Sequence, residues 1–428
     1  MLGLFMVLPV LALYQDKYSD ATPFLLGLTL GVYGLTQAIL QIPLGLLSDK
    51  IGRAPVIIGG LLIFVIGSIV AAMAESMQGL VLGRALQGMG AIASTLMALV
   101  TDLTAEQNRT KAMASIGASI GLSFMLAMIA GPIIASFMGL SGVFWVTALL
   151  GCMGIFVFVL GVPRISSPQK NRETLADLGQ IGRLLKQPTL LRLNLGIFAL
   201  HMALMAVFVV IPTMLANQLG IPGDDLWWVY LALLGGGFVA MLPVMILGEK
   251  YQCQKLTLVS AIGCMTLAML ALGIEQGPIL TLIMLLVFFI AFILLEAVLP
   301  SWLSKTCPAG SRGTAMGIYA TSQFMGAFVG GTLGGWSLQQ FGNTGVFLLV
   351  AVVLAIWWFF SLSLKSPRPL QTLVLEVGEM EHRDFVKIIS NIVGVEDILL
   401  IKGESLAYAK VDKKTVDMSS IKPYLNCN

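Results

Sequence analysis

Apolar stretches of about 20 residues alternate with short polar breaks along most of this chain. A stretch of that length can cross the ~30 Å hydrocarbon core of a bilayer as an α-helix. The pattern predicts twelve membrane-spanning helices in two groups of six, separated by a longer polar segment. The predicted spans are 1–15, 24–47, 55–74, 79–101, 111–138 and 141–162, then 192–217, 226–248, 255–274, 279–303, 313–337 and 342–364.

The first predicted span differs from the others in length. It is apolar from Met1 onward and carries no basic leading segment, so it does not match a secretory signal. As a helix rising 1.5 Å per residue, the run up to Tyr14 reaches only ~21 Å. We therefore expect a truncated first helix. The predicted domains are an N-terminal half at 1–162, a linker at 163–191, a C-terminal half at 192–364, a linker at 365–371 and a tail at 372–428.

The tail has a different composition. Residues 365–428 carry nine Lys or Arg and nine Asp or Glu and contain no run long enough to span a membrane. An extended run at 372–377 is followed by a helical pattern at 381–393, two strand-like runs at 397–402 and 405–411 with a turn at 403–404, and a last helix at 418–425. This order predicts a small α+β domain with helices on one face of an antiparallel sheet.

Composition supports a membrane protein. Hydrophobic residues make up 57% of the chain and charged residues 11%, with a mean hydropathy of +0.91, whereas soluble proteins carry about 25% charged residues. The expected partner is a lipid bilayer, with no nucleic acid. The five cysteines form no CxxC pair and no cluster with the two histidines, so neither disulfides nor a metal site is expected.

The distribution of basic residues predicts the orientation. With twelve spans, fourteen Lys or Arg of the loops fall on one side and only Lys17 on the other. Positively charged loops stay in the cytoplasm, so we expect both termini and the central linker to be cytoplasmic. The expected location is the cytoplasmic (inner) membrane of a bacterium. Arg84 is the one basic residue that this assignment leaves inside a span.

A polar hinge separates the second and third spans. Its sequence GLLSDKIGR follows the pattern G-x-x-x-D-R/K-x-G-R, with the residues Gly45, Asp49, Lys50, Gly52 and Arg53. A generic loop on the positive side of the membrane could also look polar and charged. However, every position of the pattern is filled, and the hinge resembles that of the major facilitator superfamily. The resemblance implies a twelve-helix fold in two six-helix halves. It also implies that Asp49 and Arg53 form part of a cytoplasmic latch that closes when the transporter faces outward. Asp102, at the cytoplasmic end of the fourth predicted span, is placed to pair with Arg53.

Two further stretches are similar to motifs of this family. LGRALQGMG resembles the R-x-x-Q-G motif of proton-driven facilitators and implies a role in proton coupling for Arg84. The alternative is an arginine that extends to the lipid headgroups. Gly131 and Pro132 resemble the GP motif of facilitator antiporters, here read as a helix-packing motif, although Ala135 and Ser136 stand where that pattern has glycines. Together with the tail, the chain resembles YajR-type transporters, which carry a cytoplasmic ferredoxin-like domain.

Two ionisable residues lie at predicted membrane depth in the C-terminal half. Glu296 lies midway along the tenth span, and His201 lies in the first half of the seventh. Either residue could be purely structural. A carboxylate in a low-dielectric medium favours its protonated form, so Glu296 can carry a proton. We expect Glu296 to be the proton-coupling residue, with Arg84 or His201 as its partner.

These features predict a function. No ATP-binding motif and no set of catalytic residues occurs in the chain, so an ion gradient is the expected energy source, with no cofactor, and an enzyme is not expected. The prediction is a proton-coupled secondary active transporter that exports a small, amphipathic molecule by alternating access. The alternative is a membrane sensor on a transporter scaffold that signals through its tail. The tail has no thiolate pair for metal transfer, and it could bind a regulator or another copy.

Overall fold

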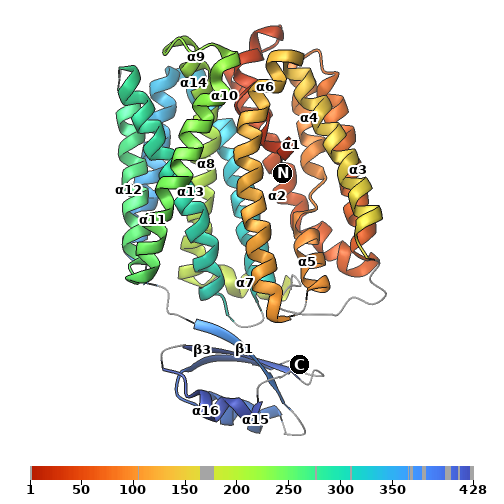
Figure 1. Cartoon of the computed structure of the whole chain (residues 1–428), viewed down its shortest axis with the longest axis vertical. Coiled ribbons are helices and arrows are strands. Elements are labelled where there is room, and N and C mark those ends of the chain that lie inside the picture. The colour runs from red at the N-terminus through yellow and green to blue at the C-terminus, as the bar shows by residue number, and fades with distance from the viewer. Residues whose placement is uncertain are drawn as a thin grey trace.

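The computed structural model describes residues 2–104, 106–163, 178–274, 277–308, 311–364, 366, 370–377, 382–400, 406–412 and 415–424. Figure 1 shows a bundle of upright helices with a small domain below it. We call the end of the bundle that faces this domain the tail end and the opposite end the distal end. Within the described residues, nine helices are long and apolar enough to cross a membrane.

The N-terminal half begins with a short, broken segment. The helices are α1 (Leu2–Phe5), the 3-10 helix η1 (Leu11–Lys17), α2 (Pro23–Ile51), α3 (Arg53–Ala72), α4 (Met77–Met89), α5 (Ala93–Leu103) and α6 (Glu106–Gly161). The predicted first span is therefore not one helix. Pro9 has no N–H to donate to the carbonyl of Phe5, which instead accepts from the Leu8 amide at 3.1 Å. The segment from Met6 to Ala12 is nevertheless buried in the bundle.

The C-terminal half holds the other long helices. They are α7 (Leu178–Leu185), α8 (Pro188–Phe208), α9 (Ile211–Asn217), the 3-10 helix η2 (Gly223–Asp225), α10 (Leu226–Tyr230), the π-helix η3 (Leu231–Gly235), α11 (Gly236–Lys250), α12 (Gln254–Leu272), α13 (Pro278–Thr306) and α14 (Arg312–Leu362). The predicted linker at 163–191 contains α7, and α8 begins at Pro188 within it. Residues 164–177 of that linker lie outside the described residues.

The nine candidate spans do not correspond one to one to the twelve predicted spans. As single helices, α6 and α14 would be about 84 and 77 Å long, too long for one crossing. Each departs from helical geometry at one glycine, Gly139 with φ 68° and Gly342 with φ 65°. Both glycines lie where the sequence predicts a boundary between two spans. The predicted span at 79–101 is broken instead, between α4 and α5.

Glycines bring α14 close to two neighbours. A Cβ on Gly330 would overlap the backbone of Met202 in α8, and a Cβ on Gly331 would overlap the backbone oxygen of Gly27 in α2. The first contact lies within the C-terminal half, whereas the second joins the two halves in the distal part of the bundle. Small residues allow this close helix approach.

The tail forms the predicted α+β domain. Strands β1 (Leu370–Glu376), β2 (Val395–Leu400) and β3 (Leu406–Asp412) form an antiparallel sheet in the order β1-β3-β2. Helix α15 (His382–Ser390), α16 (Met418–Ile421) and the 3-10 helix η4 (Lys422–Tyr424) cover one face, and Phe385 and Ile389 lie in the apolar core between the layers. The predicted turn at 403–404 lies outside the described residues.

Candidate functional site: buried charges of the helix bundle

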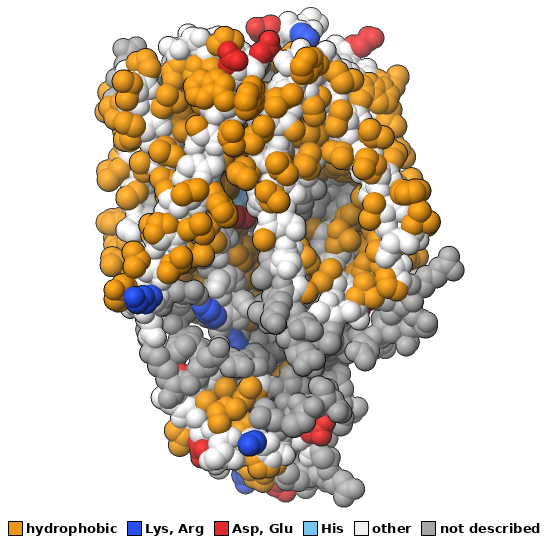
Figure 2. Space-filling model, in the orientation of Figure 1, with side chains coloured by type: hydrophobic (Ala, Val, Ile, Leu, Met, Phe, Trp, Pro, Cys, Tyr) orange, Lys and Arg blue, Asp and Glu red, His pale blue; other side chains and the backbone are white. Residues whose placement is uncertain are grey.

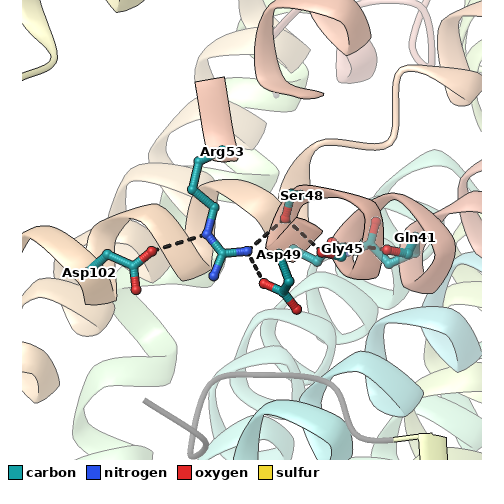
Figure 3. Close-up of polar contacts among 7 residues, drawn as sticks. Gln41, Gly45, Ser48, Asp49, Arg53 and Asp102 are labelled. Atoms are coloured by element: carbon teal, nitrogen blue, oxygen red, sulfur yellow. Dashed lines mark hydrogen bonds and ion pairs between the residues drawn. The ribbon is translucent and has the colours of Figure 1, made fainter. Parts of the chain in front are cut away.

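The hinge between α2 and α3 forms a charge network centred on Arg53. Gly52 ends α2 with φ 96°, a conformation that favours glycine, and Arg53 begins α3. The Arg53 Nε donates to Asp102 Oδ2 at 3.1 Å, and Nη1 donates to Ser48 Oγ at 2.7 Å and to Asp49 Oδ1. Figure 3 shows the guanidinium between the two carboxylates. The network therefore ties α2, α3 and α5 together.

The burial of the two ion pairs differs. The side chains of Arg53 and Asp102 are 8% and 2% exposed, whereas that of Asp49 is 23% exposed. A buried ion pair leaves a costly unpaired charge when one partner is removed. The structure thus brings Asp102 to Arg53 as predicted, and it makes this pair the stronger constraint. Lys50 is exposed and lies outside the described contacts of the network.

Ser48 extends the network toward Gly45 and was missed by the sequence reasoning. Its hydroxyl accepts from Arg53 and donates to the carbonyl oxygen of Gly45 at 2.7 Å. A Cβ on Gly45 would lie 3.1 Å from Ser94 Oγ, so glycine allows α5 to approach α2. Ser48 lies at a variable position of the motif, and only its place one turn before Arg53 could have indicated its role.

Arg84 lies fully buried in α4, within the N-terminal half. Its Nη1 donates to Gln87 Oε1 at 2.9 Å, its Nε lies 3.4 Å from the carbonyl oxygen of Thr29, and its guanidinium carbon lies 5.1 Å from the centre of the Tyr33 ring. Gln87 in turn donates to Ser68 Oγ at 2.8 Å. The Nη2 atom has no hydrogen-bond partner among the described residues. The structure therefore buries Arg84 instead of extending it to the lipid headgroups.

Glu296 and His201 come together in the C-terminal half. The Glu296 Oε2 lies 3.8 Å from His201 Nε2, which joins α13 to α8. The structure therefore brings His201, and not Arg84, to Glu296, since the described contacts of Arg84 are all within the N-terminal half. Glu296 has a side chain that is 38% exposed. Figure 2 shows a hollow between two apolar ridges, and red (Asp or Glu) and pale blue (His) atoms lie at its floor.

Gln323 of α14 completes this site and was not predicted. Its amide nitrogen donates to Glu296 Oε1 at 3.2 Å and lies 2.8 Å from His201 Nε2. Because an amide nitrogen only donates, His201 Nε2 is the acceptor and carries no proton in this arrangement. The sequence signal was weak, since a glutamine carries no charge and the prediction was based on ionisable residues. Glu296, His201 and Gln323 together are called the carboxylate site below.

Gly131 and Pro132 lie in α6 beside the buried N-terminal segment. A Cβ on Gly131 would overlap the backbone oxygen of Met6, so the glycine permits close packing there. Pro132 lines a cavity of about 300 Å³ near the distal end, which Tyr14 and Asp224 also line. Within the described residues, no group of three or more His, Cys, Asp or Glu side chains could hold a metal ion.

Comparison with known proteins identifies the class. The family model described as Major Facilitator Superfamily matches residues 1–330 and 193–402. The chain belongs to the major facilitator superfamily and is a membrane transporter, not an enzyme, as the sequence predicted.

Several relatives give a finer comparison. The chain is 44% identical to "Inner membrane transport protein YajR" of Escherichia coli over 98% of this chain and 93% of the relative. It is 38% identical to "Uncharacterized transporter BU466" of Buchnera aphidicola over 77% of this chain and 85% of the relative. It is 27% identical to "Multidrug resistance protein MdtH" of Aeromonas salmonicida over 80% of this chain and 85% of the relative. The predicted resemblance to YajR-type transporters is confirmed.

Proposed function

We propose that this chain is a proton-coupled secondary transporter that exports a small amphipathic molecule by alternating access. In this proposal twelve helices cross the inner membrane of a bacterium, and both termini and the tail are cytoplasmic. The proposal rests on the carboxylate site, which joins three helices of the C-terminal half. Two of its groups, Glu296 and His201, can exchange protons. The distant relative named as a multidrug resistance protein supports the export of amphipathic compounds.

The proton step follows from the hydrogen-bond chemistry of the carboxylate site. A proton arriving at His201 Nε2 would turn this atom into a donor that faces the donor amide of Gln323. The amide must then rotate and present its oxygen to His201, which removes its hydrogen bond from Glu296. Loss of that bond by itself favours protonation of Glu296, whereas the imidazolium charge 3.8 Å away favours its ionised form, so the two groups compete for one proton. Gln323 thus couples the protonation of one group to that of the other.

Packing between the two halves supports alternating access. In the distal part of the bundle, α2 and α14 are in backbone contact at Gly27 and Gly331, whereas toward the tail end a Cβ on Gly317 would reach Ile42 only at 4.0 Å. The side chain of Glu296 is 38% exposed, although its Oε2 atom is buried. This arrangement suits a state that receives substrate and releases protons on the cytoplasmic side.

The charge network around Arg53 is compatible with a state that is open to the cytoplasmic side. The described contacts of Arg53 stay within the N-terminal half, and they are formed while the distal parts of the two halves are closely packed. Pairing of Arg53 with Asp102 therefore does not by itself require an outward-facing state. In this proposal, the network keeps α2, α3 and α5 together as one unit while the halves move.

The test uses ethidium, an amphipathic aromatic cation, in inside-out membrane vesicles with an imposed proton gradient. The wild-type protein should accumulate ethidium against its gradient, and Glu296→Gln should abolish this accumulation because the amide cannot release a proton. Exchange of ethidium without a gradient should persist in this variant. Glu75→Gln removes an exposed carboxylate outside the helices and serves as the matched control. Accumulation by Glu296→Gln at the wild-type level would rule out this residue as the coupling site.

A further inference from the structure

One face of the tail sheet lacks its own covering helices but is buried. Along β3, Ala407, Ala409 and Val411 point into the apolar core shared with α15 and α16. Side chains alternate along a strand, so Tyr408 and Lys410 lie on the opposite face. They are nevertheless only 3% and 6% exposed. In Figure 1 this sheet lies between the helix bundle and α15 and α16, so the bundle is on the side of the uncovered face.

Lys410 connects this face to the end of α13. Its ammonium group donates to the carbonyl oxygen of Lys305 at 2.9 Å and to that of Cys307. These carbonyls belong to the last turn of α13 and to the residue that follows the helix, where no intrahelical donor is available. A positive charge is favourable at a helix C-terminus. Strand β1 also contacts α13. The tail domain thus caps the tail end of α13.

The capped segment of α13 begins next to the carboxylate site. Pro300 lies inside α13 and has no N–H to donate. The missing hydrogen bond is the one to the residue four positions earlier, which is Glu296. A helix bends most easily where a proline removes such a bond. Residues 301–306 therefore form a short helical segment, called the lever below, between the bend at Pro300 and the tail domain. Glu296 lies on the other side of this bend.

We propose that the uncovered face of the tail sheet is a regulatory docking surface for α13, and that docking sets the bend at Pro300 and the placement of Glu296. The separation of 3.8 Å between Glu296 Oε2 and His201 Nε2 is slightly longer than a hydrogen bond. A small shift of α13 is therefore enough to make or break this contact. The role assigned to Glu296 rests on the proposed function, whereas the docking itself does not.

The docking is tested by hydroxyl-radical footprinting of the full chain in lipid nanodiscs. A charge-assisted hydrogen bond is strong enough to shift an equilibrium about tenfold. Lys410→Met should therefore raise the oxidation of Tyr408 by up to about tenfold. Phe385 in the tail core should stay protected, because the domain remains folded. Lys387→Met removes an exposed lysine of α15 and should change neither residue, and Lys410→Arg should keep Tyr408 protected.

Unchanged protection of Tyr408 in Lys410→Met would overturn the docking proposal. If Phe385 also becomes reactive, the tail has unfolded in that variant. Lys410→Gln, which retains a donor for one carbonyl oxygen, then replaces Lys410→Met in the test. Unchanged protection of Tyr408 in Lys410→Gln would overturn the docking proposal.

The coupling to Glu296 is tested with dicyclohexylcarbodiimide, which modifies protonated carboxyl groups inside membranes. The rate of Glu296 modification at neutral pH, followed by mass spectrometry, should change at least about threefold in Lys410→Met, since undocking moves the lever. In a Pro300→Ala background the hinge is lost, and the same substitution should have little effect. Equal rates in Lys410→Met and wild type, with Tyr408 exposed, would overturn the coupling while leaving the docking intact. An unreactive Glu296 in every variant would count against the proposed function instead.

Discussion

Arg84 and Glu296 are both ionisable residues inside the helix bundle, but their surroundings differ. Arg84 is fully buried, and its described contacts with Gln87 and Tyr33, extended by Gln87 to Ser68, all lie within the N-terminal half. Glu296 is partly exposed, and His201 and Gln323 beside it can each change between donor and acceptor. The comparison suggests a division of roles, in which the N-terminal half keeps a permanent charge in place and the C-terminal half exchanges protons.

The largest expected effect is on stability and concerns Arg84. Arg84→Ala leaves a cavity and deprives Gln87 of its partner, so the free energy of unfolding should fall by about 2–4 kcal/mol. Glu296→Gln should change it by less than about 1 kcal/mol, because the amide is nearly isosteric and partly exposed. Thermal unfolding of both purified variants measures this difference. Equal losses of stability would remove the contrast between the two regions.

The next effect is on transport and concerns the two carboxylates that contact Arg53. Asp102→Asn weakens the buried pair and should reduce ethidium accumulation about tenfold, whereas Asp49→Asn should reduce it about two- to threefold. Membrane insertion should be unchanged in both, as judged by the amount of protein in the membrane. The reverse order of effects would show that burial does not determine the strength of this network.

A smaller effect is expected on the reactivity of the carboxylate site. Gln323→Leu removes the hydrogen bond that the amide donates to Glu296 Oε1. The rate of carbodiimide modification of Glu296 at neutral pH should therefore rise about threefold, because the lost hydrogen bond stabilised the unreactive carboxylate. Gln87→Leu, which lies beside Arg84, serves as the control and should leave this rate unchanged. An unchanged rate in Gln323→Leu would exclude the proposed role of the amide.

The smallest effect is expected at the distal end, where Asp20 caps the helix that carries Arg84. The Asp20 carboxylate accepts from the amides of Met77 at 2.8 Å and Gln78 at 3.2 Å, and these bonds hold its pKa below the ordinary value of 3.8. A lowered pKa in the folded state stabilises the protein above pH 3.8, and this contribution is lost as the pH falls through the folded-state pKa.

Asp20→Asn should consequently lower the melting temperature slightly at pH 7 and have no effect below the folded-state pKa of Asp20. Thermal unfolding of Asp20→Asn and wild type, at pH 7 and at a pH below that pKa, measures this difference in melting temperature. A loss of equal size at acidic pH would show that the cap does not depend on charge.

The hinge network and the carboxylate site differ in how far the sequence could predict them. Gly45, Asp49, Gly52 and Arg53 lie within nine residues, so local spacing was sufficient to bring them together. The pairing of Asp102 with Arg53 followed from the predicted helix order. Gln323 could not be found in this way, because its contacts with His201 and Glu296 join three helices whose relative rotation is set by packing.

The broken spans show the same limit. Hydropathy detects the apolar character of a segment, not the continuity of its helix, so the predicted spans at 1–15 and 79–101 passed over real interruptions. Proline chemistry at Pro9 explains the first break. Conversely, Gly139 and Gly342, where α6 and α14 depart from helical geometry, lie at boundaries between spans that the sequence predicts.

The sequence by itself determined the membrane class, the facilitator family, the hinge and the α+β tail, because these depend on composition and on short-range spacing. The tertiary structure alone decided which polar groups share a site. Hydrogen bonds at membrane depth need partners within about 3 Å, and glycine contacts between α14 and its neighbours set that geometry. The same holds for Lys410, whose hydrogen bonds to the end of α13 join residues 105 and 103 positions apart in the sequence.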